Sequence, residues 1–316
     1  MTMLKTGQKL PSKRGTTYTI TRFIAAGGQG EVYEVEDKKS RSSYALKWYF
    51  KHSATAYQKK LIERLVSRGK PDHRFLWPLD LVEGASGFGY VMDLRPPHYK
   101  SILDLMKRRA EPTFSALCIA GINLADGYRS LHSQGLCYRD ISFGNLFFNP
   151  ADGDVLICDN DNVTVDKDSE GSTEGTPRFI APEIIARKES PSTLTDLYSM
   201  SVLLFYMFML HHPLEGKVEA NIKCLDGLAM EKIYGKDPIF IWDPVNKSNR
   251  PVQGYQDNAI IFWEIYPPYI RELFTRAFTE GLRDPNKRIV EKPWKEAIVQ
   301  LRNSIMYCAF CGLENF

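Results

Sequence analysis

The sequence contains no apolar run long enough to cross a membrane. The longest one, Leu197–Leu210, has fourteen residues and no basic flank at its ends. As a helix it would span about 21 Å, well short of the ~30 Å hydrocarbon core of a bilayer. A helix that is hydrophobic on all sides and lies outside a membrane must be buried. We therefore expect this run to form a helix in the middle of a domain.

The sequence also lacks a strong excess of either charge and any compact cysteine framework. The formal net charge is +3, too small to indicate nucleic acid or a membrane surface as a partner. The six cysteines are scattered, and four lie inside apolar runs, as is typical of buried free thiols in a reducing compartment. Met1–Gly15 is polar and basic and has no signal pattern. We expect a cytoplasmic protein.

No segment matches the phosphate-binding pattern G-x-x-x-x-G-K-[ST], which excludes the P-loop class of nucleotide-binding proteins. The chain has 316 residues, of which 43% are hydrophobic. That is enough for a sizeable core and fits one large domain or two small ones.

The most informative stretch of the chain is centred on two short apolar strands. Leu146–Phe148 and Val155–Cys158 are joined by Asn149–Asp154, whose Asn, Pro and Asp-Gly residues are typical of a turn. The pattern predicts a β-hairpin.

Oxygen-bearing side chains flank this hairpin. Asp140 and Asn145, spaced D-x-x-x-x-N, come just before its first strand, and Asp159 follows its second strand. An antiparallel hairpin brings these two ends side by side, so we expect the three side chains to converge. Mg²⁺ prefers such oxygen ligands. Each residue alone is explained as well by turn capping, but the set in this order is what phosphoryl transfer needs.

These motifs resemble those of the protein kinase family. Tyr138-Arg139-Asp140 stands where that family has His-Arg-Asp, and Asp159-Asn160-Asp161 stands where it has Asp-Phe-Gly. The resemblance implies that Asp140 accepts or orients the proton of the substrate hydroxyl, and that Asn145 and Asp159 hold Mg²⁺ or Mn²⁺. Asp161, two residues beyond Asp159 in an extended segment, would project to the same side and reach the metal. The alternative for Asp161 is a turn cap or a pair with a nearby Arg or Lys.

A glycine loop lies between two predicted strands, the first of which is Tyr18–Ala26. Compared with the family pattern G-x-G-x-x-G-x-V, Ala25 replaces the first glycine, whereas Gly27, Gly30 and Val32 match. Such a loop lets backbone N–H groups approach phosphates. Hairpin turns use the same residues, so this motif alone is weak.

Lys47 lies in a predicted strand at the spacing of the family's Val-Ala-Ile-Lys, which implies contact with the nucleotide phosphates. Glu63, on the predicted helix Tyr57–Arg68, is the only glutamate between Lys47 and Glu83, and the resemblance makes it the partner of Lys47. An exposed lysine and a solvated glutamate are the simpler alternatives. The implied adenine pocket consists of Val32, Ala45, Met92, Asp93, Leu94 and Phe147.

The polar segment Val165–Thr176 ends before Ala181-Pro182-Glu183, which resembles the terminus of the family's activation segment. Candidate phosphorylation sites are its hydroxyls, although ordinary loops also favour Ser and Thr; they are Ser169, Ser172, Thr173 and Thr176.

Three further residues have structural roles in the family. Asp196, near the start of the predicted buried helix, would satisfy free N–H groups and brace the catalytic loop. Arg288 would pair with Glu183 in a buried ion pair.

The chain ends with Cys308-x-x-Cys311-Gly, which is how many zinc ribbons begin. Two cysteines cannot fill a four-coordinate site, so we expect a ribbon that is cut off, with Zn²⁺ and possible further partners only in a longer protein. The alternative is a chance C-x-x-C on a frayed tail.

The sequence therefore predicts an α+β protein with the two-lobed protein kinase fold. We expect a β-rich N-lobe over 1–94, a helical C-lobe over 95–306 with an activation segment over about 159–183, and the start of a zinc ribbon over 307–316.

The predicted function is Mg-ATP-dependent phosphorylation of Ser or Thr in a protein substrate, including the chain itself. The alternatives are an ATP-binding pseudokinase scaffold, favoured by Ser142 and Ala25, and a kinase-like small-molecule phosphotransferase, which generally lacks Ala-Pro-Glu. The Asp-Asn-Asp variant also resembles a bacterial subgroup, the kinases of tellurite-resistance-associated phosphorylation triads.

Overall fold

The computed structural model describes residues 3–166 and 175–316. They divide into two compact units: unit 1 is Met1–Pro97 with Leu156–Asp161, and unit 2 is His98–Val155 with Asn162–Phe316. The boundary expected after residue 94 thus falls after residue 97. A second segment joins unit 1 because Ile157 exchanges backbone hydrogen bonds with Arg74 (2.7 Å) and Leu76 (2.9 Å). The candidate phosphorylation sites Ser169, Ser172 and Thr173 lie outside the described residues.

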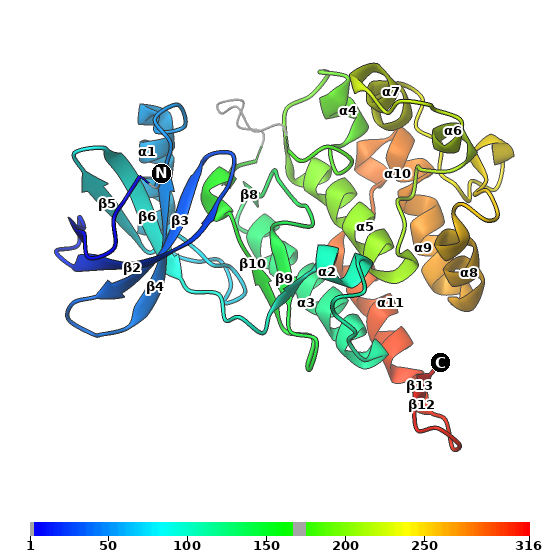
Figure 1. Ribbon diagram of the computed structural model, residues 1–316. Helices are drawn as coiled ribbons and strands as arrows, with labels where there is room; N and C mark the ends of the chain where they lie inside the picture. Colours follow the sequence, from blue (N-terminus) through cyan, green and yellow to red (C-terminus); the bar gives the residue numbers. More distant parts are fainter. Residues whose placement is uncertain (1–2, 167–174) are drawn as a thin grey trace. The chain divides into compact units, whose positions relative to one another are not determined.

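Unit 1 is built on a six-stranded antiparallel sheet with strand order β1-β2-β3-β4-β6-β5 (Figure 1). Its strands are β1 (Lys9–Pro11), β2 (Thr17–Ala26), β3 (Gly30–Asp37), β4 (Ser43–Tyr49), β5 (Asp80–Gly84) and β6 (Gly87–Asp93). The sequence did not predict β1. It closes the sheet, because the residues that follow it bridge to β5: Ser12 pairs with Val82, and Lys13 N–H donates to Leu81 O (3.0 Å).

The core of unit 1 forms around the apolar side chains of β2, β3 and β4 together with the N-terminal segment. The cluster consists of Leu4, Leu10, Tyr18, Ile20, Tyr33, Val35, Leu46, Trp48, Val82 and Val91. Leu46 and Trp48 alternate along β4 with Ala45 and Lys47. One face of the strand therefore packs in this core, and Ala45 and Lys47 lie on the opposite face.

Helix α1 (Ala56–Arg68) is fixed by a cap at each end. Thr55 accepts a hydrogen bond from Gln58 N–H (3.0 Å), and Gly69 ends the helix with φ 81°. The helix buries Leu61, Ile62 and Leu65. These contacts fix the rotation of α1 about its axis and therefore decide which of its polar side chains reach the interior.

Unit 2 is mostly helical, and its centre is α5 (Thr193–Met209). Every residue from Thr195 to Met209 is buried, which confirms the buried helix predicted from the apolar run. The other helices are α2 (Ile102–Met106), α3 (Phe114–His132), α4 (Pro182–Ile185), α6 (Lys217–Ala220), α7 (Gly227–Glu231), η2 (Lys232–Lys236), η3 (Lys247–Asn249), α8 (Asp257–Ile265), α9 (Pro268–Ala277), α10 (Glu280–Arg283), η4 (Pro285–Lys287) and α11 (Glu291–Asn303).

Unit 2 also contains short strands, some of which flank the predicted catalytic residues. They are β7 (Lys100–Ser101), β8 (Leu136–Cys137), β9 (Leu146–Phe148), β11 (Thr164–Val165), β12 (Met306–Tyr307) and β13 (Glu314–Asn315), and β10 (Val155–Ile157) begins in this unit. The predicted hairpin is confirmed, since β9 and β10 are neighbouring strands. Its turn is closed by hydrogen bonds from Asn149 N–H to Asp154 O and from Gly153 N–H to Asn149 O, both 2.8 Å.

The segment 216–266, for which the sequence indicated no chemical role, is packed around a buried polar side chain. Asn249 donates to Leu214 O (2.9 Å) and Ile239 O (2.7 Å) and accepts from Val218 N–H (2.9 Å). Trp242 stacks on Trp263 with ring centroids 5.4 Å apart.

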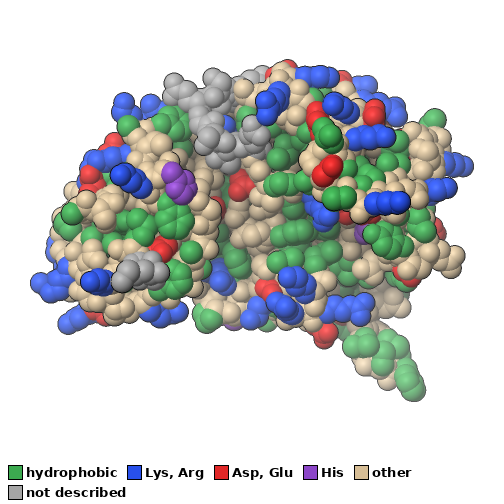
Figure 2. Space-filling view, turned by 45° about the horizontal axis from the view of Figure 1, so that its top comes forward, with side chains coloured by type: hydrophobic (Ala, Val, Ile, Leu, Met, Phe, Trp, Pro, Cys, Tyr) green, Lys and Arg blue, Asp and Glu red, His purple; other side chains and the backbone are tan. Residues whose placement is uncertain are grey.

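The chain ends in a hairpin formed by β12 and β13, which projects beyond α11 (Figure 1). Apolar side chains gather on it (Figure 2). Four of them are at least 69% exposed: Met306, Tyr307, Phe310 and Leu313.

A substitution at Gly153 tests how closely the β9–β10 turn is packed on α3. Gly153 has φ 76°, and a Cβ there would lie 2.2 Å from Ala116 O. We expect Gly153→Ala to lower the free energy of unfolding by about 2–4 kcal/mol, through left-handed strain and overpacking. Gly135→Ala is the matched control, since it has φ 70° but no atom within 4 Å. Equal losses in urea unfolding of both variants would show that the turn is not tightly packed.

Candidate active site

In unit 1, strand register brings predicted nucleotide-binding residues onto one face of the sheet. Val32 of β3 and Tyr90 of β6 are the cross-strand partners of Lys47, and Met92 is the partner of Ala45. Cross-strand partners share a face, as do alternate residues of one strand. Val32, Ala45, Lys47 and Met92 therefore lie on the face opposite Leu46 and Trp48.

The glycines at the two ends of the glycine loop are required for different reasons. A Cβ at Gly27 or Gly28 would meet no atom within 4 Å, whereas one at Gly30 would lie 2.2 Å from Trp48 O. Gly30 is therefore required by the close approach of β3 to β4. Gly27 and Gly28 are exposed and leave their backbone open to a ligand. Ala25, at the position of the missing first glycine, pairs with Val32.

Lys47 is almost completely buried and contacts two carboxylates. Its Nζ donates to Asp159 Oδ1 and lies 2.8 Å from Asp161 Oδ2 and 3.1 Å from Asp161 Oδ1. It also donates to Gln29 Oε1 of the glycine loop (3.1 Å). Burial lowers the pKa of Lys47, but the charges of Asp161 and Asp159 outweigh burial and raise the pKa above its ordinary value. Lys47 is therefore a buried cation held by the Asp-Asn-Asp segment.

The environment of Asp161 differs from that of a metal ligand. Its side chain is fully buried, and both oxygens have partners, because Oδ2 also accepts a hydrogen bond from Tyr49 O–H. The expected extended segment is instead the 3₁₀ turn η1 (Asn160–Asn162), which follows Asp159 in a left-handed conformation with φ 56°. The carboxylates of Asp159 and Asp161 do converge, but they converge on Lys47.

The predicted pairing of Glu63 with Lys47 is not present. Glu63 forms an ion pair with Lys13, and these side chains are 38% and 50% exposed. The reason is the rotation of α1, which buries Ile62 and turns Gln58 toward β4, where its amide donates to Tyr49 Oη (3.1 Å) and Asp161 O (2.8 Å). Neither Tyr49 nor Gln58 was predicted from the sequence as part of the site. The alternation of β4 places Tyr49 on the face of Lys47, which the sequence could have indicated, whereas the position of Gln58 depends on how α1 packs.

The remaining residues of the predicted adenine pocket belong to both units. Asp93 ends β6 and pairs through its carboxylate with the Lys70 amine (2.8 Å). Leu94 is half-buried in unit 1. Phe147 lies on β9 of unit 2, where it pairs with Ser101.

In unit 2, Asp140 is held from both sides. Its Oδ1 accepts a hydrogen bond from Thr176 O–H (2.6 Å), and its Oδ2 accepts one from Asn145 Nδ2 (3.0 Å). The Asn145 amide also donates to Asp140 O (2.9 Å). The D-x-x-x-x-N spacing thus closes a loop in which Asp140 and Asn145 are in contact. Thr176, a candidate phosphorylation site, has its hydroxyl hydrogen-bonded to Asp140.

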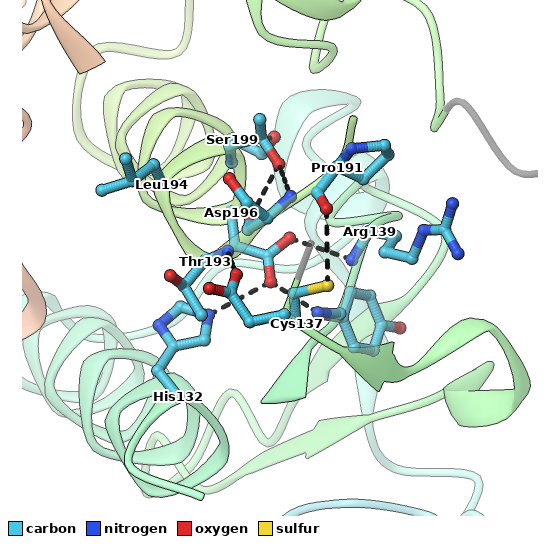
Figure 3. Close-up of polar contacts among 12 residues, drawn as sticks. His132, Cys137, Arg139, Pro191, Thr193, Leu194, Asp196 and Ser199 are labelled. Carbon is cyan, nitrogen blue, oxygen red and sulfur yellow. Dashed lines mark hydrogen bonds and ion pairs between the residues drawn. The ribbon is translucent and has the colours of Figure 1, made fainter. Parts of the chain in front are cut away.

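The loop that carries Asp140 is anchored by a buried carboxylate (Figure 3). Asp196, on α5, accepts hydrogen bonds from the backbone N–H groups of Tyr138 and Arg139, the second at 2.9 Å. Its Oδ2 is also 3.1 Å from Nε2 of His132, whose other ring nitrogen contacts Glu291 of α11. These roles of His132 and Glu291 were not predicted from the sequence. Nothing local signals their pairing, because 159 positions separate them.

Glu183 and Arg288 form the buried ion pair that the resemblance implied. Two parallel hydrogen bonds of 2.7 Å join the guanidinium to the carboxylate. Arg288 also donates to Leu194 O (2.9 Å) and Gly281 O (3.1 Å). Bidentate geometry and additional hydrogen bonds to backbone carbonyls are what a buried pair needs to be stable.

A comparison with family models decides the identity. The model described as "Protein kinase domain" matches residues 18–289. The chain belongs to the protein kinase family. It has the two-lobed α+β kinase fold, with unit 1 as the β-rich lobe and unit 2 as the helical lobe.

Curated relatives of this kinase domain are serine/threonine kinases. The chain is 29% identical over 206 residues to the probable serine/threonine-protein kinase CCRP1 of Zea mays, covering 63% of this chain and 32% of the relative. It is 25% identical over 235 residues to the cell cycle serine/threonine-protein kinase CDC5/MSD2 of Saccharomyces cerevisiae, covering 71% and 33%. The chain thus spans about a third of the length of these relatives. Both are eukaryotic, and the bacterial subgroup and the cytoplasmic location stay predictions.

In residues 3–166 and 175–316, no group of three or more His, Cys, Asp or Glu side chains is placed to hold a metal ion. No helix within the same residues is long and apolar enough to cross a membrane.

Cys308 and Cys311 lie in the C-terminal hairpin. Backbone N–H groups of Cys311 and Phe310 lower the pKa of the Cys308 thiol, which favours the thiolate form that binds metals. Zinc at these two cysteines remains a prediction.

From the contacts of His132 with Asp196 and Glu291 we expect the kinase to lose stability at alkaline pH. Burial lowers the pKa of His132, but the hydrogen bonds that its ring donates to Asp196 and Glu291 raise the pKa to about 9. Because the folded pKa is higher than that of an unfolded histidine, about 6.5, the stabilisation is complete below about pH 6.5 and is lost as pH rises through about 9. We expect the free energy of unfolding of the kinase to fall by about 2–3 kcal/mol across this window.

Urea unfolding at several pH values measures this loss. His132→Gln should flatten the dependence in the window, whereas His98→Gln, at an exposed histidine, should leave it unchanged. An undiminished slope in His132→Gln would assign the pH dependence to other groups.

Proposed function

We propose that the chain is a Mg-ATP-dependent serine/threonine protein kinase that transfers the γ-phosphoryl group to a Ser or Thr hydroxyl of a protein, including its own activation segment. The observation that carries the proposal is the environment of Asp140. Its two oxygens are oriented by Thr176 and Asn145. A half-buried carboxylate held in this way is suited to accept or orient the proton of an incoming hydroxyl.

The family's cofactor, Mg²⁺, fits the donor atoms that the chain provides. Asp159 is 34% exposed, and its Oδ1 contacts Lys47, so a carboxylate oxygen remains for a cation. Asn145 uses its amide nitrogen on Asp140, which leaves its amide oxygen. Both are the hard ligands that Mg²⁺ prefers. When bound, the metal would neutralise charge on the transferring phosphoryl group. Asp161 is not part of this set.

Three groups of residues in unit 1 would bind the nucleotide. Lys47 would contact the phosphates, because it is a buried cation on the face of Ala45 and Met92. The exposed backbone at Gly27 and Gly28 would cover them. The apolar side chains on the same face as Lys47 would contact the purine; they are Val32, Ala45 and Met92.

We expect a pocket that follows Thr176 to receive part of the polypeptide substrate. It has a volume of about 210 Å³ and is lined by α7 and Tyr234 on one side and, on the other, by Pro177, Arg178, Ile180, Ile184, Ile185 and Arg187. Ile180, Ile184 and Met230 give it an apolar wall, whereas Arg178 and Glu231 supply charge. Such a pocket suits an apolar side chain next to the acceptor residue. Phosphorylation of the chain itself would fall on Ser169, Ser172 or Thr173.

Transfer of radiolabelled phosphate from ATP tests the proposal. Asp140→Asn and Asp159→Ala should each lower the rate about 100-fold or more, with ATP binding retained in Asp140→Asn. Glu264→Gln, at a side chain that is 70% exposed, is the surface control and should match the wild type. ATP binding without any transfer by the wild-type chain would identify a pseudokinase, and transfer only to small molecules would support the third class of function.

A further inference from the structure

The lysine of the candidate site is held by a carboxylate from an unexpected element. Lys47 Nζ lies 2.8 Å and 3.1 Å from the two oxygens of Asp161. Asp161 belongs to the turn η1, which follows β10, and not to helix α1. The carboxylate of α1 that the resemblance implied, Glu63, forms an exposed pair with Lys13, and an exposed pair of this kind contributes little to stability.

Asp161 is itself held from β4 and α1. Tyr49, two residues after Lys47 on the same face of β4, donates its hydroxyl to Asp161 Oδ2, and Lys47 lies 5.6 Å from the centre of the Tyr49 ring. Gln58 of α1 donates to both Tyr49 Oη and Asp161 O. These contacts join four side chains into one polar cluster: Lys47, Tyr49, Gln58 and Asp161.

The position before Asp161 fixes the same segment in place. Asn160 is fully buried, and its amide donates to Leu76 O and Ile157 O, both at 2.9 Å. Asp161 therefore approaches Lys47 from a segment that the side chain of Asn160 ties to Leu76 O and Ile157 O. Asp159 differs from Asp161 because it is a third exposed and contacts Lys47 through one oxygen.

We propose that Asp161 is the positioning residue for Lys47 and takes the place of the glutamate of α1, with Tyr49 and Gln58 holding Asp161. The inference rests on the proposed function. The two aspartates then have different roles. Asp161 keeps Lys47 oriented. Asp159 can release Lys47 and bind a metal ion, because Lys47 stays paired with Asp161. In this kinase the orientation of the lysine then depends on the Asp-Asn-Asp segment and not on the presence of Glu63.

Steady-state kinetics of four variants test the proposal. Asp161→Asn keeps the size of the side chain but removes its charge, and we expect kcat to fall about 30-fold or more while KM for ATP changes less. Tyr49→Phe should cause a smaller fall of about three- to tenfold. Glu63→Gln should stay close to the surface control Glu83→Gln. A large loss in Glu63→Gln together with an active Asp161→Asn would overturn the proposal and return the role to α1.

A double-mutant cycle separates positioning from a general structural effect. If Asp161 acts through Lys47, adding Asp161→Asn to Lys47→Ala should change kcat by less than about twofold, because interacting residues are not additive. A further fall as large as that in the wild-type background would mean that Asp161 acts independently of Lys47, and the proposal would be wrong. Thermal unfolding of each variant identifies losses that come from misfolding.

Two binding measurements complete the test without depending on catalysis. By calorimetry, Asp161→Asn should weaken ATP binding about tenfold and leave adenosine binding within about twofold, since Lys47 acts on phosphates only. The Mg²⁺ concentration for half-maximal ATP binding should be unchanged, whereas an increase would make Asp161 a metal ligand and contradict the proposal. If the wild-type chain binds ATP but transfers no phosphate, the proposed function fails, and these measurements still decide the role of Asp161.

Discussion

The buried charge of Lys47 is the constraint on which the polar interior of unit 1 depends. Removing an ammonium group from water costs several kcal/mol unless opposite charge and hydrogen bonds replace the water. Asp161, Asp159 and Gln29 supply these contacts. Because the three come from η1, from the end of β10 and from the glycine loop, a single buried cation connects segments that are far apart in sequence. Loss of both aspartates would leave the charge of Lys47 uncompensated, whereas loss of Gln29 would remove only a hydrogen bond.

In unit 2 the buried charge is negative, and hydrogen-bond donors compensate it. The buried carboxylate of Asp196 is satisfied by two backbone N–H groups and by His132. These contacts hold Arg139 in the left-handed region with φ 76°, immediately before Asp140, and in unit 1 Asp159 is held at φ 56°. A non-glycine residue with such a φ costs of order 1–3 kcal/mol and persists only where surrounding contacts impose it. Both strained residues are beside or within the candidate catalytic motifs, so the buried charges determine the backbone from which catalytic side chains project.

Features that depend on nearby residues in the sequence were predicted correctly. Features that depend on the rotation of a helix about its axis, or on contacts between distant residues, were not. The β9–β10 hairpin follows from its turn residues, and α5 follows from its apolar run. The motif order indicated the kinase fold, which the family comparison supports. Glu63 was placed by its spacing from Lys47, but the rotation of α1 depends on how Leu61, Ile62 and Leu65 pack, and spacing does not contain that information. The contact of His132 with Glu291 depends on how α11 packs on α3, which no local pattern specifies.

The two unusual residues of the Asp-Asn-Asp motif are explained best as a pair. A buried asparagine is tolerated only if its amide finds acceptors, and Asn160 finds them in Leu76 O and Ile157 O. A buried aspartate is tolerated only beside a cation, and Asp161 finds Lys47. Each hydrogen bond of Asn160 fixes the backbone that brings Asp161 to Lys47, and the ion pair in turn keeps Asn160 in its buried position. Replacing Asn160 alone by an apolar residue would leave Leu76 O and Ile157 O without this donor, while replacing Asp161 alone would leave Lys47 dependent on Asp159. The two substitutions relative to the family pattern therefore support each other, because each supplies the geometry that makes the other stable.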